Sequence, residues 1–332
     1  MSDKNFDLIV IGAGPGGYVG AIRAAQLGMR VACIEKRPTL GGTCLNVGCI
    51  PSKALLNASE HYANAASGHL ASMGVAIGAA ILDLPAMMQS KDDIVSGLTT
   101  GIDFLFKKNK ITRLEGSARI DGAGAVTIVD GKDKGSYSTD KIMIATGSHA
   151  SSLPGITIDE KRIVSSTGAL SLDKCPKKLL VIGAGYIGLE LGTVWARLGA
   201  EVEVIEFLPR ILPGMDDEIA KKFLAIAKKQ GVSFRLSTAV KAAKTSKTGV
   251  SLTVEPAAGG AAETVTADIA LVSVGRHPAT DGLGLEAAGI SLTERGRIAV
   301  DSRFETSLDD VFAIGDVIDG PMLAHKAEED AV

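Results

Sequence analysis

Short apolar runs and helical stretches alternate along the chain, and the same order occurs twice. Residues 6–11 (FDLIVI) form an apolar run typical of a buried parallel strand. The Ala-rich stretch YVGAIRAAQLG follows, with Gly28 expected to cap the helix, and the strand MRVACIE ends at Glu35. The second copy consists of LLVIG at 179–183, the helical stretch YIGLELGTVWARLG and the strand AEVEVIE, which ends at Glu206. The pattern predicts an α/β fold with two units of the same kind.

Each first strand runs into a glycine turn of one spacing, G-x-G-x-x-G. The six glycines are Gly12, Gly14 and Gly17 in the first copy and Gly183, Gly185 and Gly188 in the second. Such a turn lets a pyrophosphate approach the backbone at a helix N-terminus, and a carboxylate about 20 residues on accepts hydrogen bonds from ribose hydroxyls. Glu35 and Glu206 both stand 23 residues after the first glycine of their turn (35 − 12 and 206 − 183). Two Rossmann-like dinucleotide-binding domains are therefore predicted.

The order of the remaining strands predicts that one domain is inserted into the other. KIMIATGS at 141–148 and IALVSVGRHP at 269–278 each end a strand in a glycine turn, and we expect the chain to cross between the domains at SLPG, residues 152–155. A further buried strand, in DDVFAIGDV, ends at Gly315-Asp316, where the acid suits a cofactor's phosphate or ribitol hydroxyls or simply ends the strand. We expect residues 1–150 and 279–332 to form one domain and residues 151–278 the other.

Composition and charge narrow the classes of partner. The 332 residues contain 46% hydrophobic and 22% charged residues, as soluble globular proteins do, and the formal net charge is −3. A chain without a broad basic field is not expected to hold nucleic acid or an anionic membrane surface. No apolar run approaches the roughly 20 residues of a membrane span, and the polar start MSDKNFD does not resemble a signal peptide. We therefore expect a cytoplasmic location.

Two of the four cysteines carry the candidate chemistry. Cys44 and Cys49 are five residues apart in GGTCLNVGCIPSK. A zinc site is disfavoured because no second Cys or His pair has suitable spacing. Since five residues of regular helix rise about 7.5 Å and a disulfide needs Cα atoms within about 7 Å, the segment must bend, helped by Gly48 and Pro51. A helix N-terminus and Lys53 would stabilise a thiolate, which indicates a redox pair. Cys33 and Cys175 are expected to be structural.

The whole chain resembles the pyridine nucleotide–disulfide oxidoreductases, most closely their dihydrolipoamide-oxidising members. GGTCLNVGCIPSKALL matches the redox-active signature of the family, and VIGAGYIGLELGTVWARLGAEVEVIEFLPRILPGMDDEIA resembles its NAD-binding unit. Further matches follow in order at ATG (145–147), VGRHPAT (274–280), AIGD (313–316) and MLAHKAEEDAV (322–332). The resemblance implies an FAD domain in two parts and an inserted NAD domain.

The resemblance also implies roles for individual residues. Cys49 would be the thiolate next to the flavin and Cys44 the thiol that exchanges with substrate, while Lys53, paired with Glu190, would sit near the flavin's reactive nitrogen. The residues implied for FAD are Gly12, Gly14, Gly17, Glu35, Lys53, Gly116, Thr146, Gly147, Asp316 and Ala324. Those implied for NAD are Gly183, Gly185, Gly188, Glu206 and Gly275.

The implied reaction is dihydrolipoamide + NAD⁺ to lipoamide + NADH through a Cys44–Cys49 disulfide and FAD. The implied partner is the lipoyl domain of a 2-oxoacid dehydrogenase complex or the H protein of glycine cleavage. Two alternatives remain open: a reductase of glutathione or mercuric ion, and a flavin-binding module without turnover. Since a 2′-phosphate requires an arginine near the second acidic position, Glu206-Phe207-Leu208 favours NAD over NADP, and Arg210 is interpreted as surface.

The family also carries a C-terminal interface domain that makes a homodimer, and a His–Glu pair that deprotonates the dithiol. None of the five histidines matches that motif (His61, His69, His149, His277 and His325). We expect the chain ending at Val332 to lack this domain and this base, so that both catalytic completeness and dimerisation are in doubt.

Overall fold

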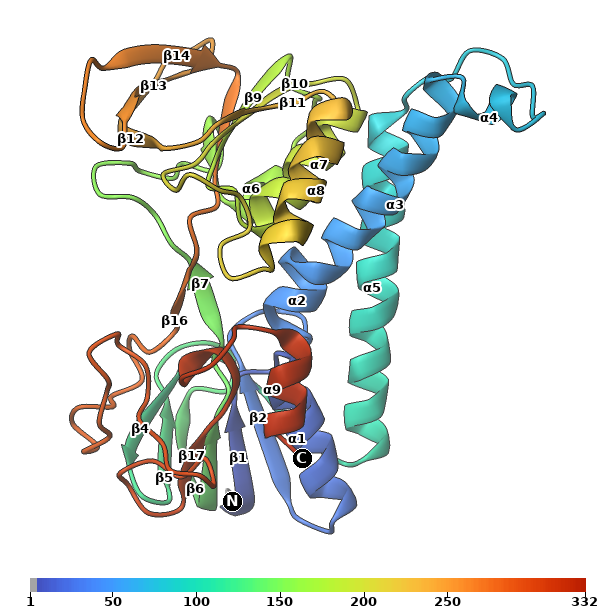
Figure 1. Ribbon diagram of the computed structural model, residues 1–332. Coiled ribbons are helices and arrows are strands. Elements are labelled where there is room, and N and C mark those ends of the chain that lie inside the picture. The colour runs from blue at the N-terminus through green and yellow to red at the C-terminus, as the bar shows by residue number, and fades with distance from the viewer. Residues whose placement is uncertain (1–4) are drawn as a thin grey trace. The chain divides into compact units, whose positions relative to one another are not determined.

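The computed structural model describes residues 5–332 and divides into two compact units. Of the described residues, the first unit comprises 5–49, 95–149 and 277–332, and the second comprises 50–94 and 150–276. Both units combine helices with parallel strands (Figure 1), which confirms the predicted α/β class with one unit inserted into the other.

The first unit is built on a seven-stranded sheet of order β3-β2-β1-β6-β5-β4, with β17 also paired to β6. Strands β1, β2, β3 and β17 run parallel to their neighbours, whereas β4, β5 and β6 pair antiparallel with one another. Its elements are β1 (Asn5–Ile11), α1 (Pro15–Gln26), β2 (Val31–Glu35), α2 (Gly42–Val47), β3 (Thr112–Glu115), β4 (Ala118–Gly122), β5 (Ala125–Ile128), β6 (Gly135–Ile144), β17 (Val311–Ala313), η1 (Gly315–Val317) and α9 (Ala324–Asp330).

The second unit repeats this plan with a five-stranded parallel sheet of order β11-β10-β9-β15-β8 and a three-stranded antiparallel sheet, β12-β13-β14. Strands β9, β10 and β11 stand to one another as β1, β2 and β3 do in the first unit. Its elements are α4 (His69–Ser72), β8 (Ile163–Val164), α6 (Ser166–Ala169), β9 (Lys178–Ile182), α7 (Tyr186–Arg197), β10 (Glu201–Ile205), α8 (Asp217–Lys229), β11 (Val232–Arg235), β12 (Thr238–Thr245), β13 (Val250–Pro256), β14 (Glu263–Ala267) and β15 (Ile269–Val272).

Four elements cross the division between the units. The long helices α3 (Cys49–Ala66) and α5 (Leu84–Lys108) and the short strands β7 (Ser148–Ala150) and β16 (Arg276–Pro278) each contain residues of both units. The predicted ranges 1–150, 151–278 and 279–332 differ from this division mainly at residues 50–94, which group with the second unit. The reason is packing: Leu55 and Leu84 belong to the second unit's core, and the Lys91 Nζ donates to the Leu170 carbonyl at 3.0 Å.

Apolar burial explains the strands on which the glycine turns depend. All five residues of β2 are buried, as are the last four of β9 and of β10, as expected for strands covered on both faces. Two boundaries differ slightly from expectation. Helix α1 has Leu27 as its C-cap, with Gly28 following at φ +93°, and β10 ends at Ile205, so that Glu206 lies just beyond it.

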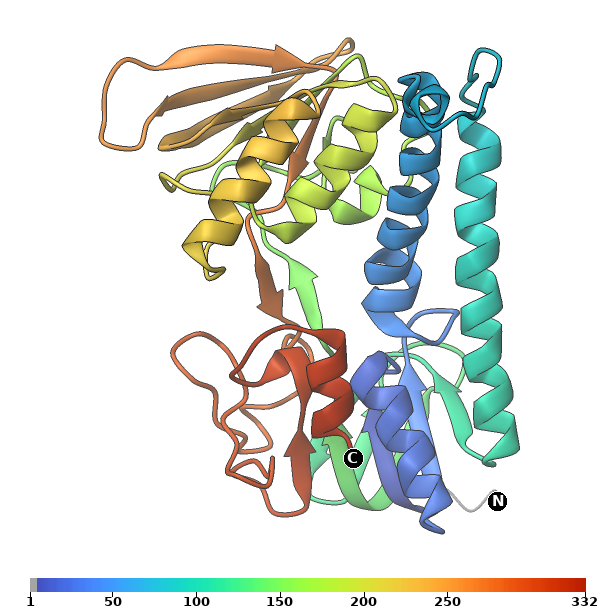
Figure 2. The ribbon, with the colours of Figure 1, turned by 45° about the vertical axis from the view of Figure 1, so that its right-hand side comes forward.

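Helix α9 lies alongside α1 in both views of the ribbon (Figures 1 and 2). Glycines make this close contact possible, because a Cβ added at Gly16 would lie 2.9 Å from the Ala327 carbonyl oxygen. One added at Gly20 would lie 3.3 Å from the Ala331 Cβ. The last helix of the chain is thereby packed against the helix that follows the first glycine turn.

Candidate active site

The first glycine turn joins β1 to α1 and has no room for side chains. Gly12 has φ +100°, and a Cβ there would lie 2.5 Å from the Ala145 carbonyl oxygen. A Cβ at Gly17 would lie 1.8 Å from the Gly12 carbonyl oxygen, so helix and strand could not pack as they do. Gly14 is the N-cap of α1 and offers no side-chain acceptor to the first N–H groups of the helix. These donors suit an anionic ligand such as a pyrophosphate.

The second turn, between β9 and α7, repeats this geometry. Gly183 has φ +101°, and a Cβ there would lie 2.5 Å from the Ser273 carbonyl oxygen. A Cβ at Gly188 would lie 2.4 Å from the Gly183 carbonyl oxygen, and Gly185 is the N-cap of α7 with open space around it. The turn therefore also fits a pyrophosphate.

The two predicted carboxylates occupy equivalent positions. Glu35 accepts hydrogen bonds from the backbone N–H of Ala13 and of Arg37, both at 2.9 Å. Glu206 accepts from the N–H of Ala184 at 2.7 Å and of Leu208 at 2.8 Å. Both side chains are buried. Each carboxylate is therefore held against its own glycine turn, where the remaining lone pairs can accept from ribose hydroxyls.

The cysteine pair lies at a break between two helices. Helix α2 ends at Val47, Gly48 follows with φ −143° and ψ −115°, and α3 begins at Cys49. A Cβ at Gly48 would lie 2.8 Å from the Thr43 carbonyl oxygen, so the break requires a glycine. The predicted bend is confirmed, as is the position of Cys49 at a helix N-terminus. All four cysteines are thiols in this structure, with Cys49 exposed and Cys44 half-buried.

The cysteine segment packs directly on the first glycine turn. The Gly41 N–H donates to the Ala13 carbonyl at 2.8 Å, and a Cβ at Gly42 would lie 2.4 Å from the Gly14 Cα. Backbone contact this close is possible only between glycines. The cysteine segment and the first glycine turn therefore belong to the same unit and touch one another through Gly41 and Gly42.

The surroundings of Cys44 favour the protonated form of its thiol. The pKa of the Cys44 thiol is raised, first by its hydrogen bond with the Cys49 side chain, then by burial and by the charge on Cys49. The Glu328 carboxylate adds a smaller effect in the same direction, and it accepts a hydrogen bond from the Tyr18 hydroxyl at 3.2 Å. Burial and Glu328 also raise the pKa of Tyr18.

Lys53, one turn after Cys49 in α3, is held by Glu190 of α7. The Lys53 Nζ lies 2.6 Å from Glu190 Oε1, and the Ser52 hydroxyl donates to Glu190 Oε2 at 2.8 Å. This is the pairing that the resemblance implies for Lys53. Both residues belong to the second unit, whereas the other residues predicted for FAD belong to the first.

The other predicted residues lie at the ends of the parallel strands or in the loops that follow. Gly147 (φ +75°) and Gly275 (φ +127°) occupy equivalent turns after β6 and β15, both with open space around the missing side chain. The Thr146 hydroxyl donates to the Ala279 carbonyl at 2.7 Å, and Asp316 accepts from the Ser148 hydroxyl. Ala324 is the first residue of α9.

Gly116 has a structural reason of its own. It has φ +151°, and a Cβ there would lie 2.1 Å from the Asp130 carbonyl oxygen. Its role towards a cofactor stays a prediction.

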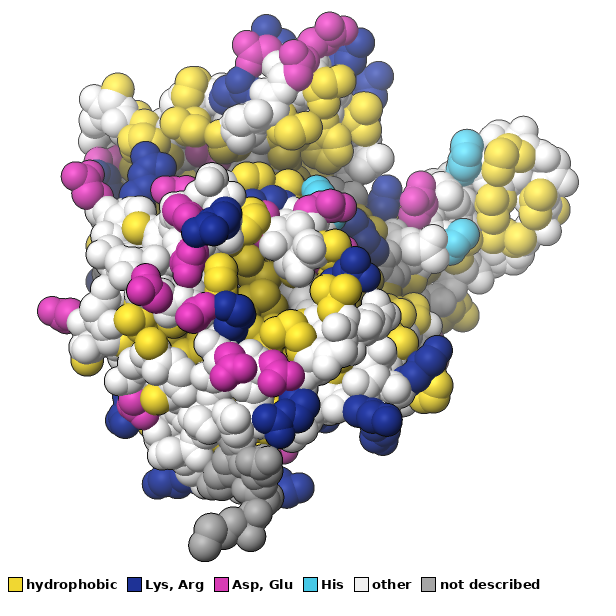
Figure 3. Space-filling model, turned by 90° about the horizontal axis from the view of Figure 1, so that it is seen from below, with side chains coloured by type: hydrophobic (Ala, Val, Ile, Leu, Met, Phe, Trp, Pro, Cys, Tyr) yellow, Lys and Arg dark blue, Asp and Glu magenta, His cyan; other side chains and the backbone are white. Residues whose placement is uncertain are grey.

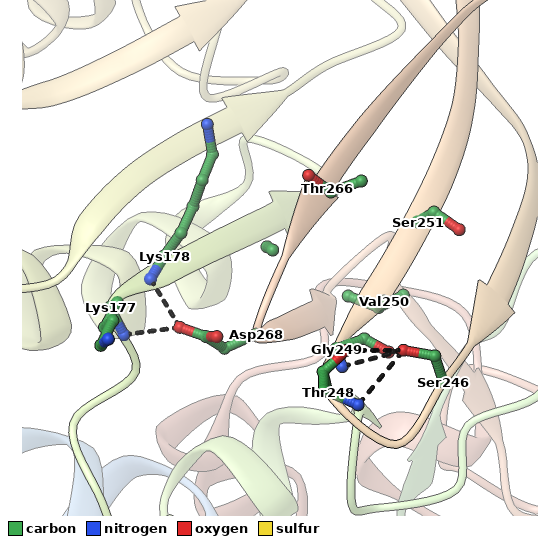
Figure 4. Close-up of a pocket in the computed structure, with 10 residues that line it drawn as sticks. Lys177, Lys178, Ser246, Thr248, Gly249, Val250, Ser251, Thr266 and Asp268 are labelled. Atoms are coloured by element: carbon green, nitrogen blue, oxygen red, sulfur yellow. Dashed lines mark hydrogen bonds between the residues drawn. The ribbon is translucent and has the colours of Figure 1, made fainter.

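A separate cleft of about 450 Å³ lies in the second unit, lined by ten residues of β9, β13, β14 and their loops. Figure 4 shows that its polar groups bind one another: Asp268 accepts from the N–H of Lys177 and Lys178, and Ser246 accepts from those of Thr248 and Gly249. None of the predicted site residues lines it.

Several absences apply to residues 5–332. No cluster of three or more metal-ligating side chains occurs among them, and none of their helices is long and apolar enough to cross a membrane. On the face seen in Figure 3, acidic and basic side chains are interspersed and form no broad basic field.

Four residues around the site were not predicted. Glu328 raises the pKa of Cys44 and accepts a hydrogen bond from Tyr18, Ser52 holds Glu190, and Ser148 holds Asp316. Only Ser52 had a sequence signal, because it stands next to Lys53 on a helix that begins at Cys49. The others come from segments up to 310 residues apart in the chain, which no local pattern connects.

Comparisons with known proteins identify the family. The model of a family described as pyridine nucleotide-disulphide oxidoreductase matches residues 6–331. Leghemoglobin reductase of Glycine max and mitochondrial dihydrolipoyl dehydrogenase of Pisum sativum are each 55% identical over the whole chain, which covers 63% and 66% of their lengths. Dihydrolipoyl dehydrogenase 3 of Pseudomonas putida is 54% identical over 99% of the chain and 70% of its own length.

Among solved structures, the HOCl-induced flavoprotein disulfide reductase RclA of Escherichia coli matches with a TM-score of 0.84 and 29% identity. The match covers 98% of this chain and 69% of that one. The chain thus spans about two thirds of the length of the curated relatives that it matches.

Proposed function

Because the chain belongs to the pyridine nucleotide-disulphide oxidoreductase family, whose members use FAD and NAD(H), we propose that it acts as a dihydrolipoyl dehydrogenase. The reaction is the oxidation of dihydrolipoamide by NAD⁺. The observation that carries the proposal is the contact between the cysteine segment and the first glycine turn, in which Gly41 binds Ala13 and Gly42 meets Gly14.

The chain's own residues supply binding and thiol chemistry. In the proposal, FAD is held by the Gly12–Gly17 turn with Glu35, and NAD by the Gly183–Gly188 turn with Glu206. The open turns at Gly147 and Gly275, together with Gly116, Thr146, Asp316 and Ala324, complete the two sites. Bound FAD supplies two-electron transfer between a dithiol and NAD⁺. Lys53, fixed by Glu190, places a positive charge one turn from Cys49.

The thiol step balances as a thiol–disulfide exchange between the substrate dithiol and a Cys44–Cys49 disulfide. A substrate thiolate attacks the Cys44 sulfur of a Cys44–Cys49 disulfide, and Cys49 leaves as a thiolate at the helix N-terminus. The second substrate thiol loses its proton and displaces Cys44, which takes up a proton, and lipoamide leaves as the disulfide. The raised pKa of Cys44 suits a sulfur that ends the step as a thiol.

The contacts of Arg210 support NAD over NADP. Its guanidinium binds Asp217 and donates to the Met215 carbonyl at 2.6 Å, so it is engaged within its own loop. A 2′-phosphate at this position would meet Glu206 without a free arginine beside it.

Relatives named dihydrolipoyl dehydrogenase support the proposed partners, which are a lipoyl domain of a 2-oxoacid dehydrogenase complex or the H protein of glycine cleavage. A cytoplasmic location stays part of the proposal, although some relatives are named mitochondrial.

The roles of the two cysteines are tested by exchanging them one at a time. In the FAD-loaded chain, Cys44→Ser leaves Cys49 as a thiolate and should produce a long-wavelength charge-transfer band near neutral pH. Cys49→Ser should not. The opposite pattern means that the roles are reversed, and a chain that takes up no FAD refutes the proposal.

Steady-state turnover with dihydrolipoamide, glutathione disulfide and mercuric ion separates the proposed activity from the reductases and from a module without turnover.

A titration without flavin checks the same assignment. Because the Cys49 side chain is the largest cause of the raised pKa of Cys44, Cys49→Ala should shift Cys44 ionisation to lower pH, as measured by thiolate absorbance near 240 nm. Glu328→Gln should shift it less, since Glu328 is the smallest cause. An unchanged Cys44 titration in Cys49→Ala contradicts the coupling between the sulfurs.

A further inference from the structure

The backbone of the turn after β17 donates a hydrogen bond to an ion pair on α9. Asp330, in the last turn of α9, has a side chain that is 8% exposed. Its Oδ2 accepts from the Gly315 N–H at 3.0 Å and lies 2.6 Å from the Lys326 Nζ. One carboxylate oxygen therefore receives both a backbone donor of the turn and an ammonium group.

The lysine of this pair is buried at its charged end. Among the described residues, the Lys326 Nζ has no solvent exposure and no hydrogen-bond partner. Its contact with Asp330 meets the distance of an ion pair but not the angles of a hydrogen bond. The lysine also packs under the following loop, where a Cβ at Gly320 would lie 3.2 Å from the Lys326 Cε. Burying an unpaired ammonium group costs free energy, so the position of Lys326 requires the Asp330 carboxylate to stay beside it.

The turn that the pair holds has little other freedom. Gly315 has φ +73°, and a Cβ there would lie 3.0 Å from the Ala327 Cβ of α9. Its N–H is the group that Asp330 binds, and the next residue is Asp316, whose carboxylate accepts from Ser148. The direction of the Asp316 carboxylate is therefore set from two sides, by Ser148 at the side chain and by Asp330 through the backbone.

We propose that Lys326 and Asp330 are positioning residues for the flavin site, which hold the Gly315–Asp316 turn in the conformation that binds FAD. The inference rests on the proposed function, because it takes Asp316 as an FAD-binding residue. The simpler interpretation is an i,i+4 pair that stabilises α9 alone, as pairs of this spacing do on exposed helices. The two differ in what they predict for FAD affinity.

The experiment measures the FAD dissociation constant of the deflavinated 332-residue chain, together with the thermal midpoint without FAD. Asp330→Ala leaves the Gly315 N–H and the Lys326 ammonium without their acceptor and should weaken FAD binding by about tenfold or more. Asp330→Asn keeps an acceptor for the Gly315 N–H and should recover part of that loss. Lys326→Met should weaken binding to an intermediate extent.

The matched control is the i,i+4 pair Lys222–Glu218 on α8, which has the same 2.6 Å separation but is exposed. Lys222→Met should leave FAD affinity unchanged. The inference is overturned if Asp330→Ala and Lys326→Met bind FAD as tightly as the unmodified chain and only their thermal midpoints are lower. The ion pair would then stabilise α9 alone. If Asp330→Ala does not fold, Lys326→Met and Asp330→Asn decide by the same criterion. If the unmodified chain binds no FAD, the proposed function fails and this inference fails with it.

Discussion

The two glycine turns have the same backbone geometry but different neighbours. A Cβ at the first glycine would lie 2.5 Å from a carbonyl oxygen in both turns, and both carboxylates accept from the N–H of the alanine that follows that glycine. Helix α9 packs closely on glycines of α1, whereas α7 contacts α3 through polar side chains. Glu190 of α7 binds Ser52 and Lys53, and Arg197 donates to the Leu56 carbonyl at 3.3 Å.

The comparison shows that the same local motif has different segments packed beside it in the two units. The first turn touches the cysteine segment, whereas helix α7, which follows the second turn, carries Glu190, the partner of Lys53. In the proposed function the turns bind the two dinucleotides, and the segments next to them supply the two cysteines and the Lys53–Glu190 ion pair. If this is right, each turn can be disabled without the other.

The largest effect should come from filling the third glycine of either turn. Gly17→Ala forces a Cβ to 1.8 Å from a backbone oxygen, and Gly188→Ala forces one to 2.4 Å, so both should cost more than about 3 kcal/mol locally. Gly17→Ala should abolish FAD binding, while Gly188→Ala should abolish NADH binding and keep the flavin. Titration with each cofactor measures this.

Gly97→Ala, on the outer face of α5 with no atom within 4 Å, is the control and should stabilise by about 0.5–1 kcal/mol. Loss of both cofactors in each turn variant means that the turns are not independent.

An intermediate effect is expected at the carboxylates. Glu206→Gln removes a charged acceptor worth about 1.5–3 kcal/mol, so the preference for NADH over NADPH should fall about tenfold or more. Glu35→Gln should weaken FAD binding and leave that preference unchanged. Arg210→Ala tests the arginine, and because its guanidinium is engaged in its own loop it should not alter the ratio. Similar affinity of the unmodified chain for NADH and NADPH argues against the assignment of Glu206.

The smallest effect concerns a side chain that only the second turn has. The Ser273 hydroxyl donates to the Ile182 carbonyl at 3.0 Å and contacts that of Gly183 at 3.3 Å, whereas the first turn has Ala145 in the equivalent place. Ser273→Ala should lower stability by about 0.5–1.5 kcal/mol, since the Ile182 carbonyl keeps its bond from the Ser273 N–H. Urea unfolding measures this, and a loss of NADH affinity as large as that in Gly188→Ala would mean that the hydroxyl does more than brace the turn.

The sequence by itself determined the features that depend on local chemistry. The glycine spacing predicts tight turns, because positive φ and close backbone contact leave no room for a Cβ. The short apolar runs before these turns predict buried strands. The bend between Cys44 and Cys49 followed from the reach of a disulfide and from Gly48. The α/β class and the insertion of one unit into the other were predicted from the order of the apolar runs and glycine turns along the chain.

Only the tertiary structure decided which distant side chains meet. Residues 50–94 were assigned to the first domain because they follow it in sequence, but the burial of Leu55 and Leu84 places them with the second unit. Tyr18 meets Glu328, and Asp330 meets Gly315, because α9 packs on α1 and against the turn after β17. A local pattern specifies a backbone conformation, whereas a contact between segments depends on the shapes of two surfaces, which no single segment encodes.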